Sequence, residues 1–226
     1  KYLDSKMKYL NQEIIKFDFD QNFKDEDLYI SKCNEHIFLL LNKWPKWSKN
    51  FLNISGEAYS GKTHFVDVFL KKFKGIKLDA NLLDNKDIDN IKIYQNIVLE
   101  NINTGVDEKL IYTLSNIIDQ DNKYLIVTSR EPIVDIKFKL DDLKSRAKNF
   151  ILQKIEKPDD EMIYALILKN LSDRQILIEK KLINYIIKRI DRSYSKIHEF
   201  IYKIDELSLK KKKSIDLKII KEVLGE

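Results

Sequence analysis

Short apolar runs alternate with amphipathic segments through the first two thirds of the chain. Four runs rich in strand-forming residues are "FLNIS" (51–55), "GIKLDA" (75–80), Ile97–Leu99 within "IKIYQNIVLENI", and "YLIVTS" (124–129). Before and between these runs, apolar positions recur at helical spacing over 32–43, 63–73 and 108–120, and Pro45 stops the first of these helices. Strands of four to six residues that alternate with helices predict a parallel sheet covered on both faces.

The pattern changes near residue 158, after which every apolar segment has a helical period. These segments are "PDDEMIYALILKNLSD", "EKKLINYIIKRI", "SYSKIHEFIYKIDELSL" and "SIDLKIIKEVL". Pro158 suits a first helical turn, and the acidic residues after it complement the helix dipole. The sequence therefore predicts an N-terminal segment (1–23), an α/β nucleotide-binding domain (24–155) and a small all-helical lid (156–226).

Composition narrows the class of protein. The 226 residues, with 43 % hydrophobic and 34 % charged side chains, indicate a globular protein rather than a disordered one. No apolar run approaches the roughly 18 residues that a bilayer span needs, so we expect no membrane partner. The N-terminus lacks the apolar core of a secretory signal, and the single Cys33 suits a reducing compartment. We expect a cytoplasmic protein.

The net charge of +5 does not by itself predict nucleic-acid binding. Lysine, asparagine and isoleucine are abundant throughout the chain, and the densest basic run, "KKKK" at 210–213, lies between two helical segments. We interpret that run as a solvated loop.

The stretch "GEAYSGKTH" (56–64) carries the clearest chemistry. It matches G-x-x-x-x-G-K-[ST] through Gly56, Gly61, Lys62 and Thr63, between a predicted strand and a predicted helix. The glycines let backbone N–H groups face phosphate oxygens, the lysine places a charge at the β- and γ-phosphates, and the threonine hydroxyl can bind Mg²⁺. The stretch therefore predicts a site for ATP or ADP with Mg²⁺.

A P-loop ATPase also needs a carboxylate at the end of a neighbouring strand to hold Mg²⁺, and usually a second one to orient the attacking water. Glu100 follows the strand 97–99 and is the candidate for the first role, although it could instead cap the next segment. The next residue is Asn101, whose amide cannot act as a base. The site is therefore predicted to hold nucleotide and to cleave it poorly.

Arg146 in "DDLKSRAKNF" has two interpretations from the residues alone. It could reach a nucleotide held by a neighbouring molecule, where it would stabilise charge on the γ-phosphate. The alternative is a surface salt bridge with Asp141 or Asp142.

These stretches together resemble the AAA+ ATPases of the DnaA group. The resemblance rests on "WPKW", "GEAYSGKTHF", "IVLENI", "YLIVTSREP", "DLKSR" and "RSYSKIHEFIYKIDELSL" with "SIDLKIIKEVLG", and it runs from about residue 24 to the C-terminus. Within the group the chain is most similar to the small Hda-type regulators. It ends at Glu226, where DnaA would continue into a helix-turn-helix domain, and this too we interpret as favouring the regulator.

The resemblance implies roles for individual residues. It makes Glu100 the Walker B acid, Thr128 or Ser129 the sensor 1 position, and Arg146 an arginine finger offered in trans. The residues that it implies in nucleotide binding are Gly56, Ser60, Gly61, Lys62, Thr63, His64, Ser129 and Arg192, with Thr63 and Glu100 at Mg²⁺.

Two positions depart from the family pattern. Asn101 stands where a second carboxylate is expected, and Ser195 where a sensor 2 arginine is expected, with Arg192 one turn earlier as a weak substitute. Both departures weaken the expectation of intrinsic ATPase activity.

The N-terminal "QEIIKF" (12–17) is similar to the peptide by which Hda-type proteins dock on the DNA polymerase sliding clamp. Gln12 would enter a polar pocket, and Ile15 and Phe17 an apolar one, from an extended backbone. An edge strand or an unstructured tail is the alternative. Met7, a few residues earlier, is a candidate natural start.

The function that the resemblance implies is regulation of replication initiation. Bound to nucleotide and to the clamp on DNA, the protein would promote hydrolysis of the ATP held by DnaA, its other partner. A homo-oligomer, an autonomous P-loop ATPase or kinase, and a DnaA-like DNA-binding factor remain open alternatives.

Overall fold

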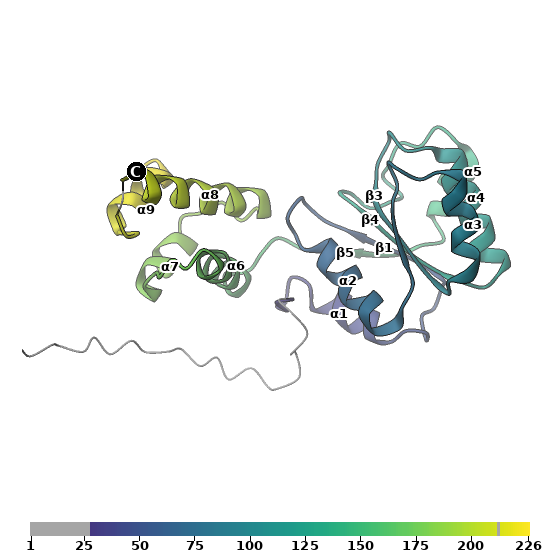
Figure 1. The fold of residues 1–226 in the computed structure, drawn as a ribbon, viewed down its shortest axis with the longest axis horizontal. Helices are drawn as coiled ribbons and strands as arrows, with labels where there is room; N and C mark the ends of the chain where they lie inside the picture. Colours follow the sequence, from purple (N-terminus) through teal and green to yellow (C-terminus); the bar gives the residue numbers. More distant parts are fainter. Residues whose placement is uncertain (1–27, 212) are drawn as a thin grey trace, which may run out of the picture.

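The computed structural model describes residues 28–211 and 213–226, which form two lobes (Figure 1). One lobe is built around a sheet, and the other consists of helices α6 to α9. The predicted fold class is confirmed: a five-stranded parallel sheet with helices around it, followed by C-terminal helices. None of the helices in the described ranges is long and apolar enough to cross a membrane.

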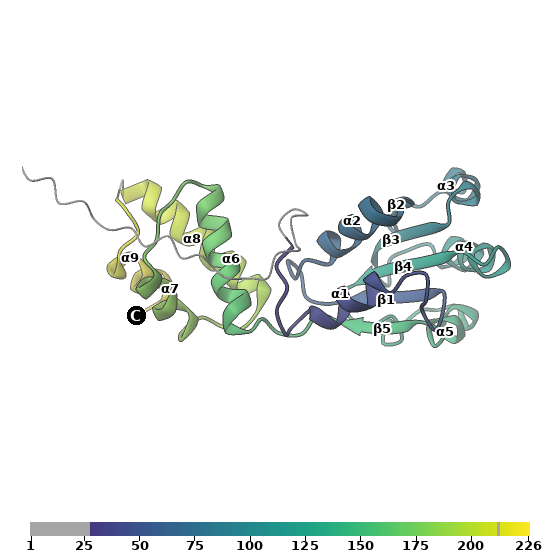
Figure 2. The ribbon, with the colours of Figure 1, turned by 90° about the horizontal axis from the view of Figure 1, so that it is seen from below.

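The strands follow the spatial order β2-β3-β4-β1-β5, and every neighbouring pair is parallel. Figure 2 shows this order across the sheet. The strands are β1 (Phe51–Ser55), β2 (Ile76–Asp79), β3 (Asn96–Ile102), β4 (Tyr124–Ser129) and β5 (Ile151–Lys154).

Helices cover both faces of the sheet. On one face lie α1 (Glu35–Asn42) and α2 (Lys62–Phe73); on the other lie α3 (Asn85–Asn90), α4 (Glu108–Gln120) and α5 (Asp141–Ala147), with the short 3-10 helix η1 (Ile91–Ile93) after α3. Each face has its own apolar cluster, because side chains of successive strand residues point to opposite faces.

The helical lobe contains α6 (Asp160–Asp173), α7 (Lys180–Ile187), α8 (Tyr194–Lys211) and α9 (Leu217–Leu224). It has a separate apolar cluster, which draws residues from all four helices. Met162 and Tyr194 are exceptions, since both are buried against the α1–α2 face of the sheet lobe. These two side chains dock the helical lobe beside the P-loop.

The hydrophobic pattern did not predict α3, α5 or β5. The helices are six and seven residues long, which is too short for a helical period to show, and α3 is held by a capping box at Asp84 rather than by an apolar face. Strand β5 has only four residues, with partly buried and exposed positions alternating, as expected of an edge strand.

A buried asparagine organises the carboxyl ends of the central strands. Asn53, in the middle of β1, is fully buried. Its amide donates to the hydroxyl of Ser129 at 2.9 Å, and its oxygen accepts the backbone N–H of Ile133 at 2.9 Å. One side chain thereby fixes the turn that follows β4.

We expect Asn53→Ala to lower the free energy of unfolding by about 1–3 kcal/mol, because the buried Ile133 N–H would lose its acceptor. Asn149→Ala, at an exposed position, is the control and should change it by less than about 0.5 kcal/mol. Chemical denaturation of the three proteins measures both effects. Equal stability of the two variants would contradict the role given to Asn53.

Candidate nucleotide-binding site

The loop 56–61 joins β1 to α2 at the carboxyl edge of the sheet. Gly61 has a φ of 90°, in the left-handed region, and stands at the N-cap of α2. A Cβ at Gly56 would lie 2.8 Å from the Ser60 hydroxyl oxygen and 3.1 Å from the Ile155 Cβ, so a larger residue there would require these side chains to move. Gly61 therefore suits the left-handed backbone, and Gly56 suits the close packing around it.

Lys62 points back into the loop. Its amine donates to the carbonyl oxygens of Gly56 and Glu57, each at 2.8 Å. Burial, and then the positive charge of Arg130, hold the pKa of Lys62 below its ordinary value. An anion in the loop would offset both effects.

Thr63 and Glu100 come together as predicted for a magnesium site. The threonine hydroxyl donates to the Glu100 carboxylate at 2.7 Å, so two oxygen ligands of the kind that Mg²⁺ prefers lie side by side. No group of three or more metal-binding side chains occurs among the residues that the structure describes. These two oxygens fit Mg²⁺ held mainly by phosphate and water, which is how that ion is usually bound with nucleotides.

Asn101 has a left-handed backbone, with φ at 63°, at an irregularity in the pairing of β3 with β4. Its amide donates to the Asp79 carboxylate at the end of β2, at 2.7 Å. Burial alone would raise the pKa of Asp79, but hydrogen bonds from Asn81 and Asn101 hold it below its ordinary value. The position expected to carry a second carboxylate thus presents an amide bonded to a neighbouring acid.

The two sensor 1 candidates are buried and have internal partners. Thr128 accepts the backbone N–H of Asn101 at 3.1 Å. The Ser129 hydroxyl accepts from Asn53 and donates to the Glu131 carbonyl at 2.6 Å. Two side chains leave this turn exposed at the cavity, Arg130 and the neighbouring Glu131.

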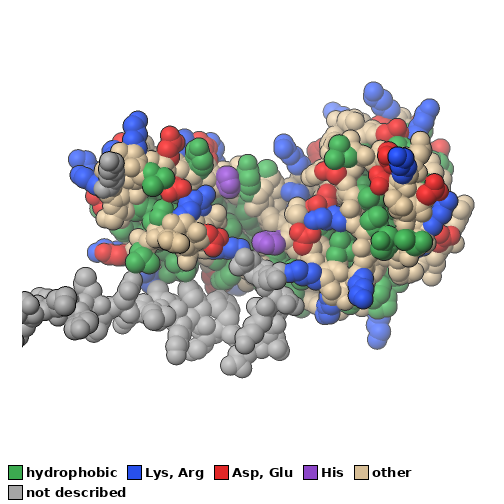
Figure 3. All heavy atoms as spheres, viewed as in Figure 1, with side chains coloured by type: hydrophobic (Ala, Val, Ile, Leu, Met, Phe, Trp, Pro, Cys, Tyr) green, Lys and Arg blue, Asp and Glu red, His purple; other side chains and the backbone are tan. Residues whose placement is uncertain are grey.

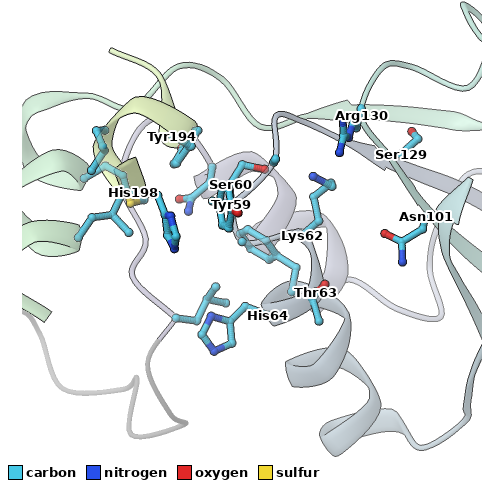
Figure 4. Close-up of a pocket in the computed structure, with 18 of the residues that line it drawn as sticks. Tyr59, Ser60, Lys62, Thr63, His64, Asn101, Ser129, Arg130, Tyr194 and His198 are labelled. Atoms are coloured by element: carbon cyan, nitrogen blue, oxygen red, sulfur yellow. The ribbon is translucent and has the colours of Figure 1, made fainter. Parts of the chain in front are cut away.

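A cavity of about 1450 Å³ opens between the two lobes, beside the P-loop. Figure 3 shows the waist between the lobes, where histidine side chains gather. The sheet lobe contributes loop residues, Asn101, Ser129 and Arg130. The helical lobe contributes mainly apolar and aromatic side chains, together with Lys169, Asn170 and Asp173 of α6. The close-up shows Lys62 between these two sides (Figure 4). Of the predicted nucleotide-binding set, Ser60, Gly61, Lys62, Thr63, His64 and Ser129 line the cavity.

A carboxylate in the P-loop caps the first turn of α8. Glu57 accepts the hydroxyl of Ser193 at 2.5 Å and the backbone N–H groups of Tyr194 and Ser195 at 3.0 and 3.2 Å. Burial would raise the pKa of Glu57, but these hydrogen bonds hold it below the ordinary 4.5. A negative side chain at a helix N-terminus is favourable, so this contact ties the two lobes together at the site.

Two further side-chain pairs join the lobes. The Tyr59 ring stacks on His198 of α8, with centroids 3.9 Å apart and an interplanar angle of 9°. The Tyr194 hydroxyl lies 3.3 Å from the Cys33 sulfur. Burial, and then the bond to Cys33, raise the pKa of Tyr194. The P-loop therefore faces the helical lobe through Glu57 and Tyr59 together.

Two arginines predicted for function lie outside the cavity. Arg192 pairs with Asp160 within the helical lobe. Arg146, on α5, bonds to the Asn116 side chain at 2.6 Å, to the Ser115 carbonyl and to Asp119 at 3.0 Å. Among the described residues its ion pair is with Asp119, so the alternative pairing with Asp141 or Asp142 is wrong.

The sequence reasoning missed Glu57, Tyr59 and Arg130. Arg130 could have been found, because it directly follows a buried strand, and parallel strands that alternate with helices place their carboxyl ends at one ligand-binding edge. Glu57 and Tyr59 carried no periodic signal, since their partners are more than 130 residues away. Gln12, Ile15 and Phe17 lie outside the described residues.

Comparison with known proteins agrees with this geometry. No family model matches the chain. The chromosomal replication initiator protein DnaA of Borrelia turicatae (strain 91E135) is 30 % identical over 183 residues, which cover 79 % of this chain and 34 % of that protein. DnaA of Buchnera aphidicola subsp. Cinara cedri (strain Cc) is 23 % identical over 245 residues, covering 96 % and 55 %. The chain spans about a third of the length of the Borrelia and Borreliella relatives.

Solved structures identify the fold. Domain III of the Thermotoga maritima replication initiation protein DnaA matches with a TM-score of 0.68 at 20 % identity, covering 88 % of this chain and 93 % of that one. AMPPCP-bound DnaA from Aquifex aeolicus gives 0.62 at 17 % identity, covering 82 % and 68 %. A point variant of Thermotoga maritima RuvB gives 0.65 at 14 % identity, covering 87 % and 70 %.

The chain therefore has the fold of an AAA+ P-loop core followed by C-terminal helices. More particularly, the core is like domain III of DnaA, the protein to which the sequence is also similar.

We expect Glu57→Ala to lower the free energy of unfolding by about 1 kcal/mol, because the first turn of α8 loses its cap. Backbone amides of residues 193–198 should exchange with solvent faster in this variant, as measured by hydrogen–deuterium exchange. Glu206→Ala, at an exposed position on α8, is the matched control and should leave this exchange unchanged. Unaltered exchange in Glu57→Ala would show that the cap contributes nothing.

The Glu57 contact should also depend on pH. The pKa of this carboxyl in the folded protein lies below its ordinary 4.5, so its stabilising effect is fully present above about pH 4.5 and is lost as pH falls through the lowered pKa. The stability difference between wild type and Glu57→Gln should therefore shrink on acidification. Denaturation at neutral and acidic pH measures it, and a difference that grows in acid would contradict the assignment.

Proposed function

We propose that this protein is a nucleotide-binding AAA+ regulator of replication initiation, which promotes hydrolysis of ATP bound to DnaA. The observation that carries the proposal is the position of Arg146. This arginine lies on α5, outside the chain's own nucleotide cavity, while the cavity keeps the parts that hold a nucleotide. A group placed there can act on a nucleotide held by another molecule and not on its own.

The cavity would hold ATP or ADP with Mg²⁺. The loop 56–61 and the N-terminus of α2 face the phosphates, Lys62 supplies a charge, and Thr63 with Glu100 would hold the ion. Mg²⁺ neutralises developing charge on the phosphates when bound. The DnaA of Aquifex aeolicus binds the ATP analogue AMPPCP at the same fold, which supports the choice of ligand.

Slow cleavage of this bound nucleotide follows from Asn101. Its amide cannot take a proton from water, and it is held by Asp79 at the edge of the sheet. The lid also lacks an arginine at Ser195, whose backbone N–H is instead bonded to Glu57. A protein that keeps its nucleotide suits a role as a binding partner.

The surroundings of Arg146 hold its guanidinium in a fixed position on α5. Its guanidinium lies over the rings of Phe51 and Tyr112, at 5.9 and 5.7 Å, and its side chain is 17 % exposed. A partner's γ-phosphate would replace Asp119, whose own side chain is 58 % exposed, as the anion on this arginine. Only the Asp119 side of this pair is open to solvent, so a phosphate would approach Arg146 from that side while Asn116 and Ser115 still hold the guanidinium.

The sliding clamp is the second partner that we propose. Gln12, Ile15 and Phe17 would enter its peptide pocket, and the clamp would bring the protein to DNA without direct DNA binding. In such a complex, the protein would meet DnaA only where replication has begun. A homo-oligomer formed through the same α5 surface is compatible with this proposal.

An autonomous P-loop ATPase is the alternative function. The Thr63–Glu100 contact supports it, since the two side chains that would hold Mg²⁺ lie side by side. Phosphate release by the purified protein without any partner distinguishes the two functions. Steady turnover would favour the enzyme.

Nucleotide binding is tested with Lys62→Ala. We expect this variant to lose most affinity for ADP and AMPPCP, because the loop loses its charge, whereas Lys137→Ala, at an exposed position outside the cavity, should bind as wild type does. Isothermal titration calorimetry measures both. Absence of binding by the wild-type protein would refute the proposed function.

The trans activity is tested with Arg146→Ala. Wild-type protein with DNA-loaded clamp should accelerate hydrolysis of the ATP bound to the DnaA of the same organism. With Arg146→Ala in its place, the acceleration should be roughly 10³-fold smaller. Arg189→Ala, in which another ion-paired arginine is removed, is the control and should be fully active. Equal activity of Arg146→Ala and wild type would rule out the arginine finger.

A further inference from the structure

Arg130 is a cation at the nucleotide cavity that the proposed function does not use. It is the only arginine that lines the cavity in the described part of the chain. Its side chain is exposed to solvent, and it makes no ion pair with any described residue. The other arginines with predicted roles, Arg146 and Arg192, are both paired.

The sheet places Arg130 at the phosphate end of the cavity. Strand β4 is paired with β1 in register, so that Ser129 lies opposite Ser55, and the backbone N–H of Gly56 donates to the Ser129 carbonyl at 3.1 Å. Arg130 therefore leaves β4 beside the first P-loop glycine. Strand β4 is also the neighbour of β3, which carries Glu100.

In the close-up (Figure 4), the end of the cavity that contains Arg130 lies away from the helical lobe. Arg130 and Asn101 lie on the side of Lys62 that faces away from Tyr194 and His198 (Figure 4). Apolar and aromatic side chains of the helical lobe line the opposite side and suit a base. Arg130 is thus at the end where a terminal phosphate would lie.

The backbone holds this position firmly. Asn53 bonds to the Ser129 hydroxyl and to the Ile133 N–H, and that hydroxyl donates to the Glu131 carbonyl, so the turn is bonded on both sides of Arg130. Because the turn is already held in place, Arg130 can contact a ligand without the entropy cost of ordering the backbone on binding.

We propose that Arg130 binds the terminal phosphate of a nucleoside triphosphate in the chain's own cavity and thereby makes the site prefer ATP to ADP. The inference rests on the proposed nucleotide site and adds the residue that reads the third phosphate. Arg130 would supply the positive charge that the helical lobe lacks at Ser195, and it would approach the phosphates from the opposite side. A planar guanidinium can donate two parallel hydrogen bonds to a phosphate.

The electrostatics of the loop agree with this role. Lys62 and Arg130 are close enough for the arginine to help lower the pKa of the lysine, and Glu100 and Glu57 offset this only in part. Two like charges facing one cavity are unfavourable until an anion binds between them. A triphosphate carries more charge than a diphosphate and so gains more from the pair.

The test compares AMPPCP, which is not hydrolysed at the terminal phosphate, with ADP by calorimetry. Wild type should bind AMPPCP more tightly. We expect Arg130→Ala to weaken AMPPCP binding by roughly ten- to hundredfold and ADP binding by less than about threefold, since only the triphosphate reaches the arginine. Arg130→Lys should be intermediate, because it keeps the charge and loses the paired hydrogen bonds.

Lys137→Ala removes a positive charge from the same connecting segment, outside the cavity, and should bind both nucleotides as wild type does. Unchanged AMPPCP affinity in Arg130→Ala, or equal losses for AMPPCP and ADP, would overturn the inference. If Lys62→Ala loses binding while Arg130→Ala does not, the nucleotide site stands and only the role of Arg130 falls. If wild type binds neither nucleotide, both proposals fall.

Discussion

The parallel pairing of β1 with β4 is the constraint on which the site depends. Because both strands end at the same edge of the sheet, the P-loop and the turn after β4 begin side by side, joined by the bond from Gly56 N–H to the Ser129 carbonyl. The neighbouring β3 brings Glu100 to the Thr63 hydroxyl at the same edge. Three segments that are distant in sequence thus share one cavity, as is general for open parallel sheets.

The contact between the lobes is made from the P-loop itself. Glu57 caps α8, and Tyr59 stacks on His198, so two side chains of the phosphate loop hold the helical lobe. The helical lobe is therefore held in position without an arginine of its own that contacts the phosphates. This is consistent with serine at residue 195. A change in the loop on nucleotide binding would reach α8 directly through Glu57.

Charges of both signs surround the site. The turn after β4 contributes Arg130 and Glu131, α2 contributes Lys62, and the Glu57 carboxylate of the loop is bonded to α8. The expected second carboxylate is replaced by Asn101, whose amide is bonded to Asp79 and cannot act as a base. The arginine proposed to act in trans is separated from all of this on α5, where Asn116 and Asp119 hold it.

The sequence by itself determined the fold class and the phosphate loop. Apolar strands that alternate with helices and the spacing from Gly56 to Thr63 are local features, and local backbone chemistry decides them. Short elements escaped notice, since α3 and β5 are too brief to show a period. Only the tertiary structure decided which side chains meet: Glu57 with α8, Asn53 with the turn after β4, and Arg146 with Asp119. These contacts join residues 27 to 138 positions apart, and no periodicity along a chain encodes which distant residues the packing of a sheet and a lid will bring together.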